Sequence, residues 1–283
     1  MTTSIHTNAS ALVALQNLNR TNDQLAATQG RVNTGLKVQG AKDNAAVWAV
    51  AQGQRADKGS LEAVTTSLNR ATSIADVSLA AGEQISDIML ELKQKATAAA
   101  DPSATAATRA SYNDEFQSLL KSIQSFADNA VFDGANILDG ASATALDFLA
   151  SADGAETISL NRQDLTLAGL GLAADAGPPV VAAPDLTSEA NATAALTRVD
   201  AALATVGERL AALGAEAKQI ERHTTYVGKL SDALESGIGN LVDADLARES
   251  ARLQALQVQQ QLGVQALSIA NQAPQIILSL FQN

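Results

Sequence analysis

The chain has 283 residues, of which 46% are hydrophobic but only 3% aromatic, and its formal net charge is −11. An acidic chain disfavours a nucleic-acid partner, because phosphates would be repelled and the proteins that bind them carry basic stripes. An apolar content that is mostly aliphatic is typical of long packed helices rather than of a ligand-lined pocket. Cysteine is absent, which excludes disulfides, thiolate metal sites and cysteine nucleophiles.

The N-terminal segment is nearly uncharged, since His6 is the only ionisable side chain between Met1 and Asn19. Its apolar residues recur at helical spacing and predict a helix from about Thr3 to Asn33. The apolar stripe consists of Ile5, Leu12, Leu15, Leu18, Leu25 and Val32, and it continues to Leu36. No cationic region precedes a compact apolar stretch, so a classical signal peptide is not expected.

Glycine and proline organise the rest of the first half. Thr34–Lys42 is predicted as a glycine-bounded loop, and a long helix is predicted from about Asn44 to Ala99. Pro102 then predicts a turn, because proline interrupts a helix. A third helix is predicted from about Ala104 to Ala130, where the apolar residues again lie on one face.

The middle of the chain, residues 141–186, has only short patterns. Alternating runs at Thr157–Leu160 and Leu165–Leu167 predict a small β-hairpin region, and Gly177–Pro184 is expected to be an exposed turn or short linker. The chain then returns as a helix from about Thr187 to Gly239. The order of elements is therefore helices, a β-bearing segment, and helices again.

The C-terminal segment from Leu253 to Asn283 has no charged side chain, yet glutamine and asparagine interrupt it too often for a membrane span. Its apolar residues form two helical rows. One row is Leu253, Leu256, Gly263, Leu267, Ala270, Ile277 and Phe281, and the other is Val258, Leu262, Ile269, Ile276 and Leu280. A helix that is apolar on several sides needs several protein neighbours, so we expect the two uncharged ends to pair and to pack against further copies. The predicted fold is mainly α: an elongated antiparallel helical rod or coiled-coil bundle, with both termini paired at one end and a small β-hairpin region mid-chain.

Four segments resemble one protein family. Arg31–Ala46 reads RVNTGLKVQGAKDNAA and resembles the R-L-x-S-G-L-x-I-x-x-A-K-D-D-A-A segment of bacterial flagellins. Ser268–Phe281 resembles their A-Q-A-N-Q-x-P-Q-x-V-L-S-L-L ending. Phe132–Leu138 is similar to their F-N-G-x-x-L-L turn, and Ile238–Ala247 to their R-I-x-D-x-D-Y-A entry into the last helix. The signature positions at the two ends are Gly35, Leu36, Ala41, Lys42, Asp43, Ala45, Asn271, Gln272, Pro274 and Gln275.

The resemblance implies a structural subunit that polymerises into the extracellular bacterial flagellar filament used for swimming motility. Residues 1–43 and 241–283 would form its core-tube helices. Residues 44–140 and 187–240 would form the surrounding rod, and residues 141–186 a short β-hairpin and loop segment in place of larger outer domains.

The resemblance also implies export by the flagellar type III apparatus, guided by an uncleaved segment from about Met1 to Arg31. The protein would then be secreted without a cleaved signal peptide. Expected partners are identical or paralogous flagellins, hook-associated and cap proteins at the filament ends, and the export machinery with an export chaperone. No nucleic acid, membrane, cofactor or metal partner is expected, and no enzymatic activity.

One departure from the family bears on recognition by animal hosts. Flagellins that the animal Toll-like receptor for flagellin detects carry an R-V-R-E-L patch on the second rod helix. The aligned stretch here consists of Glu91, Leu92, Lys93, Gln94 and Lys95, with Glu115 on the third helix as a surviving partner acid. Reversing a charge and removing an apolar anchor each cost about 1–3 kcal/mol at a binding hot spot, so poor recognition is predicted.

Flagellins of this kind are often O-glycosylated on exposed hydroxyls. The candidates in this chain are Ser142, Thr144, Ser151, Thr157 and Thr166.

Catalytic and metal-binding interpretations find little support. His6 and His223 do not form the paired arrangement of a zinc protease. Asp243, Asp245 and Glu249 stand at the start of the last predicted helix, where acids cap amides and complement the helix dipole.

Two other hypotheses remain open. A hook-filament junction protein shares the terminal helices, but its loop after the first helix usually reads more like R-P-S-D-D-P, whereas Gly40–Ala46 follows the flagellin form. A secreted coiled-coil adhesin or translocator would lack the Asn271–Gln275 signature and would not polymerise.

Overall fold

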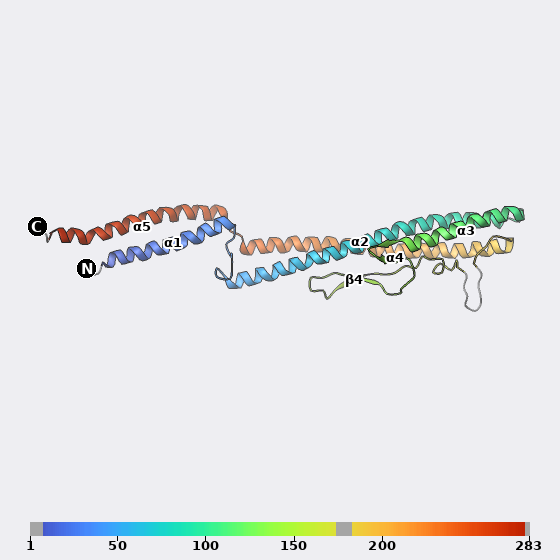
Figure 1. Cartoon of the computed structure of the whole chain (residues 1–283), viewed down its shortest axis with the longest axis horizontal. Helices are drawn as coiled ribbons and strands as arrows, with labels where there is room; N and C mark the ends of the chain where they lie inside the picture. Colours follow the sequence, from blue (N-terminus) through green and yellow to red (C-terminus); the bar gives the residue numbers. More distant parts are fainter. Residues whose placement is uncertain (1–7, 174–182, 281–283) are drawn as a thin grey trace. The chain divides into compact units, whose positions relative to one another are not determined.

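The computed structural model describes residues 8–173 and 183–280, with side chains as far as Gln272 in the second range. This part of the chain forms five α-helices and two short antiparallel strand pairs (Figure 1). The chain divides into a terminal unit, residues 1–56 and 233–283, and a central unit, residues 57–232. The predicted mainly α fold with a small β region is confirmed.

The terminal unit pairs the first and last helices. α1 spans Ala9–Thr34 and α5 spans Leu246–Leu280, and the two lie side by side and antiparallel (Figure 1). Asn8 caps α1, because its side-chain oxygen accepts a hydrogen bond from the backbone amide of Ala11 at 3.1 Å. α5 continues past Pro274, so this proline does not end the helix. The predicted pairing of the two uncharged ends is confirmed.

Three long helices supply the central unit. α2 spans Ala45–Ala99, α3 spans Ala106–Asn129 and α4 spans Glu189–Val242, each within a few residues of the predicted bounds. α2 and α4 begin or end in the terminal unit, and only their parts within residues 57–232 belong to the central unit. The predicted division at residues 43/44 and 240/241 stays a prediction.

Buried residues in the central unit follow a heptad pattern. Along α2 most of them alternate at spacings of three and four residues, with Ile74 also buried beside Ala75. α3 shows the same spacing, and on α4 the spacing widens to seven residues after Val206, which is the heptad repeat of coiled-coil packing. The rows are Leu61, Val64, Leu68, Ala71, Ala75, Ser78, Gly82, Ile85, Met89, Leu92, Ala96 and Ala99 on α2; Ala192, Ala195, Val199, Ala202, Val206, Leu213, Ile220 and Val227 on α4; and Phe116, Leu120, Ile123 and Ala127 on α3. The core of this unit is therefore mostly aliphatic, as the composition predicted.

The turn between α2 and α3 is held by Arg109. Its guanidinium donates to the carbonyls of Ala99 at 2.9 Å and Asp101 at 2.8 Å. The backbone amide of Ser103 donates to the Asp101 carboxylate, and together with the Ser103 side chain it holds the pKa of Asp101 below its ordinary value.

The β region differs in part from the prediction. β1 (Val131–Phe132) pairs with β2 (Ala135–Asn136), and β3 (Leu146–Leu149) pairs with β4 (Thr157–Leu160). The strand predicted at Thr157–Leu160 is thus correct, but its partner is Leu146–Leu149.

The strand predicted at Leu165–Leu167 is wrong. The amide of Leu165 donates to the carbonyl of Leu138, and the Asp164 carboxylate accepts from both the amide and the hydroxyl of Thr166. The Asp164 side chain therefore bonds to a backbone amide that a strand would pair with its neighbour, and residues 167–170 form a turn. Most of the predicted turn at Gly177–Pro184 lies outside the described residues.

Candidate assembly surface and polar sites

The seam between α1 and α5 uses the first of the two predicted rows. Leu256 is 4% exposed, and Gly263 lies against Leu18, whose Cδ1 would be 3.2 Å from a Cβ added to the glycine. Other predicted packing residues are partly buried in the same pair of helices, namely Leu25, Val32, Leu253 and Leu267. The described part of this row therefore packs within the chain.

Polar contacts fix the register of the seam. The side-chain amide of Asn8 donates to the carbonyl of Ala270 at 2.7 Å, and the side-chain amide of Gln260 donates to the side-chain oxygen of Asn22 at 2.8 Å. Arg31 pairs with Glu249 at 3.4 Å near the opposite end of the seam. Because directional bonds occur along its length, a slip of one helical turn would break all of them.

The second row points away from the seam. Val258, Leu262 and Ile269 on α5 are 54%, 58% and 69% exposed. We call these three residues, which share one face of α5, the outer row. Further exposed apolar residues of the two helices are Leu12, Val13, Leu15 and Val264. An exposed apolar surface of this kind marks an interaction site. The predicted residues Ile5, Ile277, Leu280 and Phe281 lie outside the described side chains.

The signature residues occupy the ends of these helices and the loop after α1. Gly35 ends α1 with a φ of 72°, a conformation that glycine adopts without strain, and Leu36 is partly buried. Ala41, Lys42, Asp43, Ala45, Asn271 and Gln272 are exposed. The side chains of Pro274 and Gln275 lie outside the described residues.

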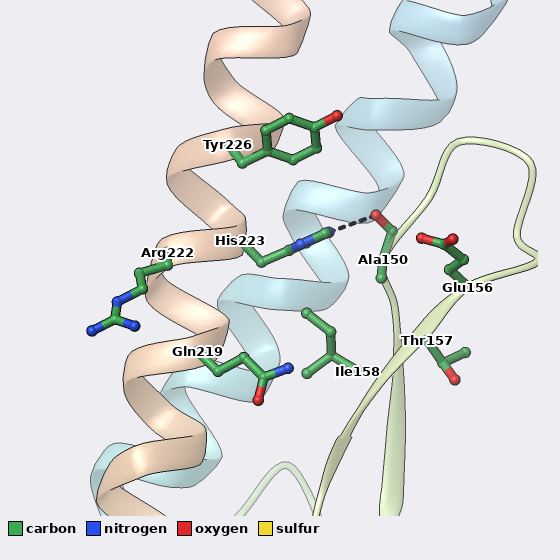
Figure 2. Close-up of a pocket in the computed structure, with 8 residues that line it drawn as sticks. All are labelled: Ala150, Glu156, Thr157, Ile158, Gln219, Arg222, His223 and Tyr226. Carbon is green, nitrogen blue, oxygen red and sulfur yellow. Dashed lines mark hydrogen bonds between the residues drawn. The ribbon is translucent and has the colours of Figure 1, made fainter.

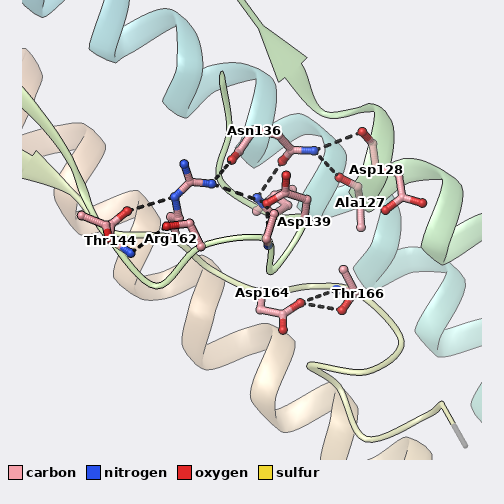
Figure 3. Close-up of polar contacts among 11 residues, drawn as sticks. Ala127, Asp128, Asn136, Asp139, Thr144, Arg162, Asp164 and Thr166 are labelled. Carbon is pink, nitrogen blue, oxygen red and sulfur yellow. Dashed lines mark hydrogen bonds and ion pairs between the residues drawn. The ribbon is translucent and has the colours of Figure 1, made fainter. Parts of the chain in front are cut away.

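A polar network centred on Arg162 holds the loops of the central unit together (Figure 3). Its guanidinium donates to the carbonyls of Thr144 at 2.9 Å and Asn136 at 2.6 Å, and pairs with Asp139 at 3.5 Å. The buried Asn136 side chain donates to the carbonyls of Ala127 and Asp128 at the end of α3. Sequence reasoning missed this network, because its partners lie apart in the chain and form no local pattern.

His223 ties the β3–β4 hairpin to α4 (Figure 2). Its Nε2–H donates to the carbonyl of Ala150 at 2.7 Å, and its ring lies 5.7 Å from that of Tyr226. Both rings border a shallow depression, whose other lining residues are Ala150, Glu156, Thr157, Ile158, Gln219 and Arg222. The histidine therefore has a positioning role in the fold.

Within the receptor-patch stretch, both lysines are engaged inside the chain. Lys95 pairs with Glu115 on α3, which raises the pKa of Lys95 above its ordinary value. Lys93 pairs with Asp200 on α4 at 2.8 Å. Glu91 is exposed. The α2 surface here is thus tied to both neighbouring helices.

The five candidate hydroxyls differ in accessibility. Thr144 and Thr157 are exposed, and Ser142 is partly buried. The Ser151 hydroxyl donates to Asp153, and Thr166 is 7% exposed with its hydroxyl bonded to Asp164.

The described residues contain no cluster of histidine and acidic side chains that could hold a metal ion, and no described helix is long and apolar enough to cross a membrane. Asp245 instead accepts from the amides of Ala247 and Arg248 at 3.1 Å each, which is the capping role predicted for it. His6 lies outside the described residues.

Residues 5–143 match the bacterial flagellin N-terminal helical region, and residues 196–281 match the bacterial flagellin C-terminal helical region. The chain belongs to the bacterial flagellin family. This flagellin is 49% identical to flagellin FljM of Caulobacter vibrioides, over 99% of this chain and 98% of that protein. It is 38% identical to a flagellin of Brucella melitensis, over 99% of each chain.

A solved structure shares the fold of this flagellin. It is that of a Vibrio parahaemolyticus protein described as flagellar hook-associated, with a TM-score of 0.57 over 71% of this chain and 100% of that one. At 11% identity the likeness shows the fold alone. Membership of the flagellin family makes the chain a structural subunit of the extracellular flagellar filament, as predicted, and does not favour the junction-protein or adhesin hypotheses.

Proposed function

We propose that this flagellin polymerises through the outer row of its paired terminal helices. The observation that carries the proposal is the exposure of Leu262 and Ile269 on a helix segment without charge. Covering one such side chain contributes about 1.5–3 kcal/mol. Identical copies can meet there without like-charge repulsion, and repeated contact between unlike patches builds an open helical polymer.

The test replaces Leu262 and Ile269 with serine in one variant, Leu262→Ser with Ile269→Ser. Removing two contacts of this size is expected to raise the critical concentration for filament formation about a hundredfold or more, measured by sedimentation and electron microscopy. Far-UV circular dichroism of the dilute monomer should stay unchanged, because both side chains are exposed. A matched control is Gln259→Ser with Gln265→Ser, on the same helix and also exposed. Filaments forming at the original concentration would refute the proposed surface.

The remaining packing assignments extend the same proposal. The first predicted row, which contains Leu256 and Gly263, would join α1 to α5, and Ile5, Ile277, Leu280 and Phe281 would prolong the apolar surfaces toward the two ends. The division into core-tube, rod and outer segments at residues 43/44, 140/141, 186/187 and 240/241 is likewise proposed. Cysteine pairs placed on either side of these boundaries and cross-linked in filaments would test it.

We further propose export by the flagellar type III apparatus, with Met1–Arg31 as the export segment, and contact with an export chaperone, hook-associated proteins and cap proteins. The low charge and amphipathic pattern of this segment support its recognition by other proteins. Deletion of the flagellar export ATPase should abolish secretion. Recovery of filament protein cleaved within Met1–Arg31 would contradict the retained segment.

The patch on α2 supports poor recognition by the animal receptor for flagellin. Glu91 places a negative charge on the surface. Glu115, the acid that a receptor cation would need as its partner, is already paired with Lys95. A receptor-reporter assay should show little activation, with an enteric flagellin as the positive control. Activation comparable to the control would contradict this proposal.

Among the five hydroxyl candidates, exposure favours Thr144 and Thr157 for O-glycosylation. Intact-mass spectrometry of filament protein, followed by peptide mapping, tests the assignment. An unmodified mass would remove it.

A further inference from the structure

One face of α4 carries polar side chains that bind loop backbone in the central unit. Arg209, Glu216 and His223 follow one another at intervals of seven residues, which places them on the same face of the helix. Arg198 precedes Arg209 by about three helical turns and lies on that face as well. We call these four residues the polar row.

The two arginines of the polar row hold the end of one loop segment, residues 146–173. The guanidinium of Arg198 donates to the carbonyl of Gly171 at 3.0 Å, and that of Arg209 donates to the carbonyl of Gly169 at 3.2 Å. Both acceptors are backbone atoms, so the contacts fix the path of the chain rather than the identity of a side chain.

The other two residues of the polar row hold the β3–β4 hairpin. The Glu216 carboxylate accepts from the backbone amide of Asn161 at 2.9 Å and from its side-chain amide at 2.6 Å. His223 donates to the carbonyl of Ala150 at 2.7 Å (Figure 2). As α4 proceeds from its arginines to His223, the bound positions move backwards along the segment, which therefore runs antiparallel to the helix.

The segment has little regular structure of its own. β3 and β4 have four residues each, and an isolated two-stranded hairpin is at best marginally stable in water. The bonds from the Asp164 carboxylate to Thr166 close only a local turn. Ser67 on α2 and Gln124 on α3 each accept one amide of the segment. Most of the order in the segment must therefore come from packing on the helices and from the polar row.

α4, in contrast, is held by contacts that do not involve the polar row. Its backbone hydrogen bonds lie within the helix. Val206, Leu213 and Ile220, each three positions before a member of the polar row, are 0% exposed and belong to the helical core. Releasing the segment leaves this buried row in place.

We propose that α4 is the template on which residues 146–173 take their structure, and that the dependence runs in one direction. The segment needs the polar row of α4 for its order, whereas α4 stays ordered without the segment. Proteins open locally in cooperative units of different stability, and the segment is then a less stable unit than the helix that carries it. Because α4 follows the segment in sequence, the loops remain without their structure until the returning helix has packed.

Hydrogen exchange in the dilute full-length monomer tests the first half of the proposal. Glu216→Ala with His223→Ala removes two contacts of the polar row, so peptides covering residues 146–161 should exchange about tenfold faster or more, the effect of losing a hydrogen bond to a charged group. Peptides from residues 200–230 should exchange at an unchanged rate, because the buried row is intact. Glu221→Ala removes the same charge from an exposed position that lines a different face of α4, and this matched control should change neither set.

A variant in the segment tests the other half. Ile158 on β4 is 8% exposed, so Ile158→Ser weakens the buried face of the hairpin without changing the polar row. Exchange should again rise in residues 146–161 and stay unchanged in residues 200–230.

Two results would overturn the template. One is faster exchange in α4 together with the segment in either variant, because the two would then form one cooperative unit. The other is unchanged exchange of the segment after loss of Glu216 and His223. The first variant alters only partly buried side chains and decides the matter by itself if Ile158→Ser does not fold. All peptides lie in the central unit of a monomer, so the result is independent of whether the outer row mediates polymerisation.

Discussion

Gly82 lies where α2 packs closely against α4 in the central unit. It lies in the buried row of α2, and a Cβ added to it would be 2.3 Å from Cδ2 of Leu210 and 3.4 Å from Cδ1 of Leu165. Carbon atoms cannot approach as closely as the first distance, so Gly82→Ala must displace Leu210. Leu210 is partly buried and borders a groove lined by residues of α2 and α4.

The magnitude follows from two opposing effects. Alanine in place of glycine inside a helix gains about 1 kcal/mol, whereas overpacking a core costs about 1–3 kcal/mol. Gly59 on the same helix provides the matched control, because nothing lies within 4 Å of a Cβ added there. Gly59→Ala should therefore stabilise the protein, and Gly82→Ala should be less stable than this control by about 1–3 kcal/mol.

Thermal unfolding of the monomer, followed by far-UV circular dichroism, measures the difference. In a unit of this size 1 kcal/mol corresponds to about 2–4 °C in Tm, so the two variants should differ by roughly 2–12 °C. Hydrogen exchange in peptides containing Gly82 and Leu210 should rise only in Gly82→Ala. Equal stabilisation by both substitutions would refute the packing argument.

Three further predictions concern polar contacts. Arg162→Ala should destabilise the central unit by about 1.5–3 kcal/mol, because it removes a charged donor from two backbone carbonyls and from Asp139. Arg70→Ala, at an exposed ion pair with Asp133, should cost at most about 1 kcal/mol in the same urea titration. Asp245→Ala should lower helix stability by about 1 kcal/mol and speed exchange in residues 246–249; unchanged exchange there would contradict the cap. The Ser151 hydroxyl, followed by the Ala155 amide, lowers the pKa of Asp153, so this carboxylate should stabilise its turn fully above its ordinary pKa and lose that effect as pH falls through the lowered value. Amide NMR shifts of Ala155 against pH would show this transition, and a transition at the ordinary aspartate pKa would refute it.

Helix positions were largely predictable from local pattern. The absence of proline before Pro102 and the spacing of apolar residues predicted α2 as Asn44–Ala99, against Ala45–Ala99 in the structure. A helix that buries one face needs an apolar residue at every third or fourth position, so the pattern can be recognised within a short stretch of sequence. The strand predicted at Leu165–Leu167 failed because Asp164 bonds to the backbone and the hydroxyl of Thr166, which a period of two does not reveal.

The candidate assembly surface was predictable only as a set of residues. The sequence predicted two apolar rows on the last helix, but not which row would face α1. Contacts such as Leu18 with Gly263 and Asn22 with Gln260 decided this, because they set the rotation and register of one helix against the other. Because Leu256 is buried in the seam, Leu262 and Ile269 are left exposed on the other face of α5 and are the candidates for assembly.

By itself, the sequence determined the helical class, the uncharged ends and the motifs that indicate the flagellin family. These properties depend on residue type and spacing, which folding does not change. Only the tertiary structure decided that Arg162 organises the loops and that Leu36 pairs with Asp243 from the other end of the sequence. Those roles depend on residues that approach each other only after long segments have packed, so no local pattern could contain them.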